Sequence, residues 1–197
     1  MINRRHFLWL ASSTLTGLTI SHGQAAGESA GNQAPMSHMT AYAFRFKALD
    51  GGDISLSDFA GRPILVVNTA SLCGYTPQYT GLQALWMRYR ERGLVVLAVP
   101  SNDFGSQEPG SASDISRTAH QEYHVTFPLT GKAAVKGKNA HPFYRWAALE
   151  LPQNAPRWNF HKYLIGRDGR LKAGFTSAVE PTDPGIIVAI ETALAAE

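Results

Sequence analysis

Residues 63–101 read PILVVNTASLCGYTPQYTGLQALWMRYRERGLVVLAVPS, and this stretch decides the fold class. Its two ends are continuous runs of β-branched and other apolar residues, as expected of central strands covered on both faces. Between them lies one apolar helical stripe that ends at Gly93 and consists of Leu82, Leu85, Trp86 and Tyr89. A strand, a helix and a strand at this length predict a right-handed crossover unit.

The segments on either side of this unit complete an α/β pattern. Residues 41–61 alternate apolar and polar around Asp50-Gly51-Gly52, which predicts a small N-terminal hairpin. Later segments predict a helix, a strand, a second helix, a hairpin turned by Asp168-Gly169 and a closing helix. The helices are expected within 111–124, 141–150 and 183–196, and the hairpin within 158–177. The whole order predicts an α/β fold with a mixed sheet flanked by helices.

Composition narrows the classes of function. The chain has 197 residues, of which 44% are hydrophobic and 17% charged, so it can bury one substantial core. Its formal net charge is +3, but without residues 1–25 the balance is 16 Lys and Arg against 15 Asp and Glu. A charge near neutrality gives no argument for a nucleic-acid partner or an anionic membrane surface.

The first 25 residues have the character of an export signal. Arg4-Arg5-x-Phe7-Leu8 is similar to the core of a twin-arginine signal, and Gly23-x-Ala25 offers a small-x-small cleavage site. The apolar stretch behind the arginines is too short and too weakly apolar to be a good permanent span. We therefore expect a periplasmic protein, with an uncleaved membrane anchor as the alternative. The predicted organisation is a signal over 1–25, a flexible linker over 26–40 and one domain over 41–197.

Cys73 is the only cysteine in the chain, so the fold cannot depend on a disulfide framework. It follows a predicted buried strand and precedes a predicted helix. Sites in open α/β sheets form at the carboxyl ends of strands, and a helix N-terminus favours a thiolate over a thiol. This position indicates a reactive cysteine. The alternative is an inert, buried thiol that serves as a small apolar side chain.

Three segments together resemble the signatures of the glutathione peroxidase family in its cysteine form. They are NTASLCGYTPQYTGLQAL at 68–85, VPSNDFGSQEPG at 99–110 and WNFHKYLIGRDG at 158–169. The resemblance extends from about Tyr42 to the C-terminus. It implies a thioredoxin-like fold and a thiol peroxidase without a cofactor, in which a peroxidatic cysteine is supported by Gln, Trp and Asn. These positions correspond here to Cys73, Gln107, Trp158 and Asn159.

The chemistry of this set can be argued from the residues. Attack on a peroxide O–O bond needs a thiolate, a positioned hydroperoxide and a proton source for the leaving oxygen. The side-chain amides of Gln107 and Asn159 and the indole N–H of Trp158 are neutral donors. They can stabilise a sulfur anion and a developing oxyanion without adding a competing charge.

The sequence also departs from the family pattern. The second signature usually reads Cys-Asn-Gln-Phe-Gly, whereas residues 101–105 are Ser-Asn-Asp-Phe-Gly. Thioredoxin-dependent members carry a resolving cysteine where this chain has only Ala119, His120 and Gln121. We therefore expect an external thiol, either glutathione, another small thiol or a thioredoxin-like protein, to reduce the oxidised Cys73. The short segment 141–158 is similar to that of monomeric members of the phospholipid-hydroperoxide type.

Other classes fit the residues less well. A peroxiredoxin would have Thr or Ser where Ala70 stands, and a disulfide-exchange protein would have a second thiol at Thr76 or Pro77. His120 and His124 are four residues apart, but Gln121 stands where a zincin has Glu, so no metal site is expected. A non-enzymatic peroxide sensor or binding module on the same fold remains the alternative. The sequence leaves open whether the oxidant is hydrogen peroxide or an organic hydroperoxide.

Overall fold

The computed structural model describes residues 39–196, so the predicted signal and all but the last two residues of the predicted linker lie outside it. The main helices are α1 (Gln78–Tyr89), α2 (Ala112–Ser116), α3 (Pro142–Glu150) and α4 (Pro184–Ala195). The strands are β1 (Arg45–Lys47), β2 (Asp53–Ser55), β3 (Ile64–Thr69), β4 (Val95–Pro100), β5 (Lys162–Ile165) and β6 (Leu171–Phe175). Within residues 39–196, no helix is long and apolar enough to cross a membrane.

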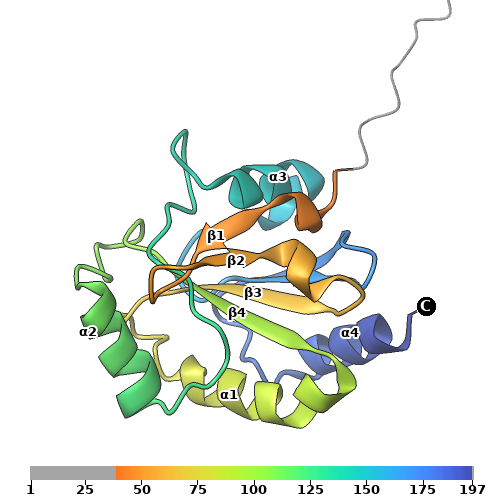
Figure 1. The fold of residues 1–197 in the computed structure, drawn as a ribbon, viewed down its shortest axis with the longest axis horizontal. Helices are drawn as coiled ribbons and strands as arrows, with labels where there is room; N and C mark the ends of the chain where they lie inside the picture. The colour runs from red at the N-terminus through yellow and green to blue at the C-terminus, as the bar shows by residue number, and fades with distance from the viewer. Residues whose placement is uncertain (1–38, 197) are drawn as a thin grey trace, which may run out of the picture. The chain divides into compact units, whose positions relative to one another are not determined.

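The main sheet has the strand order β4-β3-β5-β6, and β1 pairs with β2 in a separate antiparallel hairpin (Figure 1). Strands β3 and β4 are parallel, as the strand–helix–strand unit requires, while β3 with β5 and β5 with β6 are antiparallel. The predicted mixed sheet is thereby confirmed. β3 is central, but β4 is the last strand at its end of the sheet, which the sequence did not predict.

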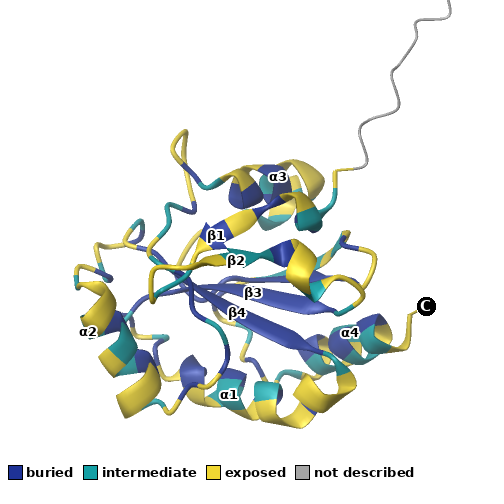
Figure 2. Ribbon diagram, viewed as in Figure 1, coloured by how far each residue is buried: buried dark blue, intermediate teal, exposed yellow. Residues whose placement is uncertain are grey.

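Helices cover both faces of this sheet (Figure 1). On one face, Leu65 and Val67 of β3 belong to a cluster that includes residues of α1 and α4. On the other face, Ile64 and Val66 belong to a cluster with α3 and the β1–β2 hairpin. The alternation of side chains along a strand sends successive residues into these two cores, and Figure 2 shows β3 and β4 buried throughout. This explains why both strands read as continuous apolar runs.

Two elements differ from the sequence expectation. The helix predicted over 111–124 ends as an α-helix at Ser116 and continues as a π-helix from Arg117 to Glu122. The strand predicted between the two middle helices is reduced to isolated bridges at Leu129 and Thr130. Pro128 has no N–H and cannot donate to a ladder, which limits pairing in this segment. The N-terminus of α2 follows its local code, because Ser111 and Asp114 form a capping box.

Candidate active site

Cys73 lies in a turn between the end of β3 and the start of α1, as predicted. Its side chain is buried, with 6% of the residue exposed. The N–H of Tyr75 donates to the Cys73 sulfur across 3.4 Å. The sulfur therefore has a backbone hydrogen-bond donor within its own turn.

Thr76 holds this turn in shape and was not singled out as a functional residue. The N–H of Cys73 donates to Oγ1 of Thr76 across 3.1 Å. The same hydroxyl lies 2.8 Å from the carbonyl oxygen of Ala70 and 2.7 Å from that of Cys73, to which it can donate. All of these atoms are buried, so their hydrogen bonds are protected from water. The signal in the sequence was a hydroxyl residue three positions after the only thiol.

Gln107, Trp158 and Asn159 come together although more than 50 residues separate the first from the other two. Nδ2 of Asn159 donates to Oε1 of Gln107 across 3.0 Å. The Trp158 ring lies against Phe104, with ring centroids 5.9 Å apart. Gly105 and Ser106 both have positive φ values, 63° and 51°, and so turn the chain sharply just before Gln107.

The loop that carries Gln107 is fastened to the loop that carries Cys73. The N–H of Leu72 donates to the carbonyl oxygen of Gln107 across 2.9 Å. The N–H of Ser71 donates to Oε2 of Glu108 across 2.9 Å. These two bonds join neighbours of Cys73 to the segment that supplies a predicted donor. Within residues 39–196, no hydrogen bond joins the Cys73 sulfur itself to Gln107, Trp158 or Asn159.

Glu108 is the residue in this region that sequence reasoning missed. It is 1% exposed, and burial raises the pKa of its carboxyl group, against the effect of the Ser71 N–H. Its own N–H donates to Oδ1 of Asn102 across 2.8 Å, so both the backbone and the side chain of Glu108 are hydrogen-bonded. The available signal was an acid directly after the predicted donor Gln107. Its role depends on Ser71, which is 37 positions away in the chain.

Asn159 is fully buried, and the residue after it is strained. Phe160 has a φ of 62°, an uncommon conformation for a bulky residue, and it is completely buried. Asn68 holds this bend: its carbonyl oxygen accepts from Phe160 N across 2.5 Å. Its Nδ2 donates to the Trp158 carbonyl oxygen across 3.1 Å. Strain maintained by surrounding contacts is typical of functional sites, and here it lies directly after Asn159, whose side chain bonds to Gln107.

Two buried bases follow this bend. Lys162 donates to Oε1 of Gln78 across 2.6 Å and to the Val179 carbonyl oxygen across 2.5 Å, and burial lowers its pKa to about 8. His161 is 3% exposed, and burial, assisted by the charge of Lys162, lowers its pKa to about 4. His161 is therefore neutral near pH 7.

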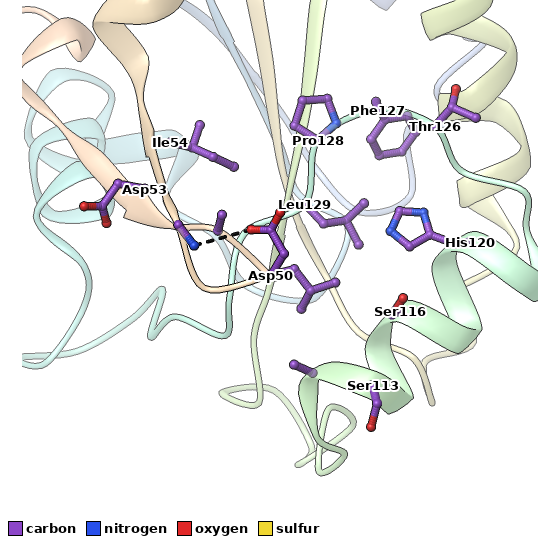
Figure 3. Close-up of a pocket in the computed structure, with 14 residues that line it drawn as sticks. Asp50, Asp53, Ile54, Ser113, Ser116, His120, Thr126, Phe127, Pro128 and Leu129 are labelled. Carbon is purple, nitrogen blue, oxygen red and sulfur yellow. Dashed lines mark hydrogen bonds between the residues drawn. The ribbon is translucent and has the colours of Figure 1, made fainter.

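A cavity of about 700 Å³ lies away from the predicted catalytic residues, between the turn of the β1–β2 hairpin and α2 (Figure 3). Its walls include Asp50 from the hairpin, Ser113 and Ser116 from α2, and His120 from the π-helix. His120 also contacts the Val125 carbonyl oxygen through Nδ1, at 2.8 Å. This wall therefore includes part of the 119–121 segment, in which the sequence analysis noted the absence of a resolving cysteine.

Residues 41–148 match the glutathione peroxidase family, which is more than half of the chain. The chain belongs to the glutathione peroxidase family. As a member of that family it is a peroxidase and therefore an oxidoreductase.

The chain has relatives in distant organisms. It is 43% identical to hydroperoxy fatty acid reductase gpx1 of Synechocystis over 153 residues, which cover 73% of this chain and 90% of the relative. It is 41% identical to the glutathione peroxidase-like peroxiredoxin gpx1 of Schizosaccharomyces pombe over 149 residues, 74% of this chain and 93% of the relative.

Solved structures confirm the thioredoxin-like fold of the chain. The crystal structure of Trgpx in its apo form superposes with a TM-score of 0.64 at 34% identity, covering 79% of this chain and 96% of that one. A thiol:disulfide interchange protein of the thioredoxin family from Chlorobium tepidum superposes with a TM-score of 0.59 at 14% identity, covering 80% and 97%. The second likeness concerns the fold alone.

Proposed function

We propose that Cys73 is the peroxidatic residue and that Gln107, Trp158 and Asn159 support its reaction. The thiolate sulfur attacks one peroxide oxygen, so that an S–O bond forms while the O–O bond breaks. The other oxygen leaves with the electron pair of that bond and takes up a proton, giving an alcohol, or water from hydrogen peroxide. Sulfur is oxidised to a sulfenic acid, and the peroxide is reduced.

The main support for this proposal is that the segment with Gln107 is hydrogen-bonded to the turn that contains Cys73. Two bonds of 2.9 Å, from Leu72 N and Ser71 N, tie the 107–108 segment beside Cys73. A hydroperoxide bound at this junction would meet a thiolate on one side and neutral N–H donors on the other. Such donors stabilise the developing charge at little reorganisation cost because they are already in place.

Regeneration needs an external thiol, because the chain has no second cysteine. One thiol forms a mixed disulfide with Cys73 and releases the sulfenic oxygen as water. A second thiol then attacks the mixed disulfide, which releases the reduced Cys73 and a disulfide of the two reductant molecules. Glutathione, another small thiol or a thioredoxin-like protein can perform these steps.

The surface near Cys73 supports an apolar hydroperoxide as one of the substrates. Leu72, next to the cysteine, is 67% exposed, and Trp158 is 39% exposed. Exposed apolar side chains beside a reactive centre are suited to an acyl chain. The Synechocystis relative is named a hydroperoxy fatty acid reductase, which agrees with this choice. We propose that organic hydroperoxides are accepted in addition to hydrogen peroxide.

The decisive experiment is multiple-turnover peroxide consumption by the mature protein. Hydrogen peroxide and a fatty-acid hydroperoxide are each tested with glutathione and with a thioredoxin system. Many turnovers per Cys73 support the proposed enzyme. One oxidation event per chain, with no turnover under any reductant, would instead support the peroxide sensor.

We also propose that residues 1–25 direct export to the periplasm, as a monomeric enzyme after cleavage. Support comes from Arg4-Arg5 and the small residues at Gly23 and Ala25. Cell fractionation with mass determination tests this proposal, with Arg4→Lys/Arg5→Lys as the variant. If the variant reaches the periplasm in the same amount as the parent protein, the twin-arginine route is excluded. Sedimentation of the mature form measures its oligomeric state.

A further inference from the structure

Lys162 is a buried cation that the proposed reaction does not use. It belongs to β5 and is 0% exposed. Its Nζ donates to Oε1 of Gln78 across 2.6 Å and to the carbonyl oxygen of Val179 across 2.5 Å. Burial of a charged group costs free energy, and an apolar side chain of similar volume is often as stable at such a position. A buried lysine with these bonds therefore indicates a role other than stability alone.

Gln78 uses its whole side-chain amide in the same network. Besides accepting from Lys162, it donates through Nε2 to the carbonyl oxygen of Ser177 across 2.8 Å and to Oε1 of Glu180 across 3.2 Å. Gln78 is 3% exposed, so its amide is largely shielded from water. Burial lowers the pKa of Lys162 to about 8 and the charge of Glu180 opposes this shift, so the ammonium form predominates at pH 7.

Gln78 is also the first residue of α1 and lies directly after the turn that contains Cys73. Its N–H donates to the carbonyl oxygen of Tyr75 across 2.9 Å. The N–H of Tyr75 in turn donates to the Cys73 sulfur across 3.4 Å. The position of the sulfur therefore depends on where the first turn of α1 is held.

Lys162 is close in sequence to the donor cluster as well. It follows Asn159 by three residues, and the strained Phe160 lies between them. The backbone of Lys162 is paired with Val67 of β3, so its strand is fixed in the sheet. Its side chain thus joins the strand that follows Asn159 to the helix that follows Cys73. A bond between these two elements can fix the spacing between the thiol and its donors.

We infer that Lys162 is a positioning residue: through Gln78, it holds the turn of the reactive thiol in register with Asn159. This inference rests on the proposed function, in which Asn159 supports the attack of Cys73 on a peroxide. A misplacement of reacting groups by about 1 Å can cost on the order of a hundredfold in rate. Lys162 therefore contributes to the oxidation of Cys73 without contacting the peroxide.

The test compares two reactions of the same thiol in the full chain. Single-turnover oxidation by hydrogen peroxide needs the thiol and its donors together, whereas alkylation by iodoacetamide needs only the thiol. Cys73 is the only cysteine, so mass spectrometry of quenched samples follows both reactions at one residue. Lys162→Met keeps an unbranched side chain without the charge. It should slow oxidation on the order of tenfold and change the rate of alkylation by less than about twofold.

A second variant shows whether Lys162 acts through Gln78. Gln78→Met removes the amide and should likewise slow oxidation but not alkylation. The double variant should be no slower than the slower single variant, because both changes break the same bond. Lys172→Met is the matched control, since Lys172 belongs to the neighbouring strand β6 and pairs with Asp168 at the hairpin turn. It should leave both rates unchanged.

Circular dichroism checks that each variant is folded, and Gln78→Met decides the question if Lys162→Met does not fold. Oxidation at the parent rate, or equal slowing of oxidation and alkylation, would overturn the inference. The same slowing in Lys172→Met, or single effects that multiply in the double variant, would also overturn it. If peroxide does not oxidise Cys73 in the parent protein, the proposed function fails and this inference fails with it.

Discussion

The side-chain amide of Asn159 donates to Oε1 of Gln107 across 3.0 Å, which joins the end of the loop before β5 to the loop after β4. Both residues lie near the carboxyl end of β3, where the chain turns through Cys73. The bond fixes the two amide groups relative to each other, and Nδ2 of Asn159 also donates to the carbonyl oxygen of Phe104 across 3.4 Å. It gives a structural basis for treating the two amides as one unit.

The first prediction concerns the nucleophile. Cys73→Ser should abolish peroxide reduction and leave the fold intact, because a serine hydroxyl is barely ionised near neutral pH. Peroxide consumption with excess thiol measures activity, and circular dichroism checks the fold. Turnover that survives in the folded variant would exclude Cys73 as the peroxidatic residue.

The second prediction concerns oxidation without a reductant. Excess peroxide should convert Cys73 to sulfinic and then sulfonic acid, because no second cysteine in this chain can trap the sulfenic acid within the molecule. Intact-protein mass spectrometry should show the addition of two and then three oxygen atoms. A product that remains at one added oxygen would show that the buried turn protects the sulfenic acid.

The third prediction concerns the donor cluster. Gln107→Ala, Trp158→Phe and Asn159→Ala should each slow single-turnover oxidation of Cys73 more than they reduce stability. Loss of one preorganised donor typically costs on the order of a hundredfold in rate, about 3 kcal/mol. Trp158→Phe should have the mildest effect, since it keeps an apolar ring near Phe104. Parent oxidation rates in all three variants would refute the assigned roles, and urea unfolding midpoints give the stability comparison.

The fourth prediction tests the link between the two loops. Glu108→Ala removes the acceptor of the Ser71 N–H and should lower the free energy of unfolding by about 1–3 kcal/mol, because a buried donor loses its partner. It should also slow the oxidation of Cys73. Glu108→Gln keeps an oxygen acceptor and should recover most of both losses. If glutamine behaves like alanine, the carboxylate charge rather than the hydrogen bond is what matters here.

The fifth prediction concerns pH and His161. Burial lowers its pKa to about 4 from 6.5, so between these values the unfolded chain binds more protons than the folded chain. His161 therefore makes the free energy of unfolding fall as pH decreases from 6.5 to about 4, and its effect is absent above 6.5. His161→Phe should have a shallower loss of stability across this window, measured by urea unfolding. Parallel pH profiles for the two proteins would mean that the histidine is not buried in its neutral form.

Some structural features were predictable because neighbouring residues encode them. The hairpin turn at Gly169 has a φ of 74°, and Gly93, with a φ of 107°, ends the 3₁₀ helix Arg90–Arg92 that follows α1; both follow from the freedom of glycine to adopt positive φ. The capping box of α2 follows from Ser111 and Asp114 alone. By contrast, no residue pattern near Ser116 predicts the change from α-helix to π-helix, and the sequence predicted one continuous helix.

By itself, the sequence determined the strand–helix–strand unit, the place of the single thiol between them and the family to which the chain belongs. Apolar periodicity and short motifs are properties of adjacent residues, so they are readable without coordinates. Only the tertiary structure decided that Glu108 accepts a hydrogen bond from Ser71 beside Cys73, and that Nε2 of His161 is buried with no hydrogen-bond partner within residues 39–196. The physical reason is that burial and hydrogen bonding depend on which distant segments pack together, and the type of a residue does not identify its partner.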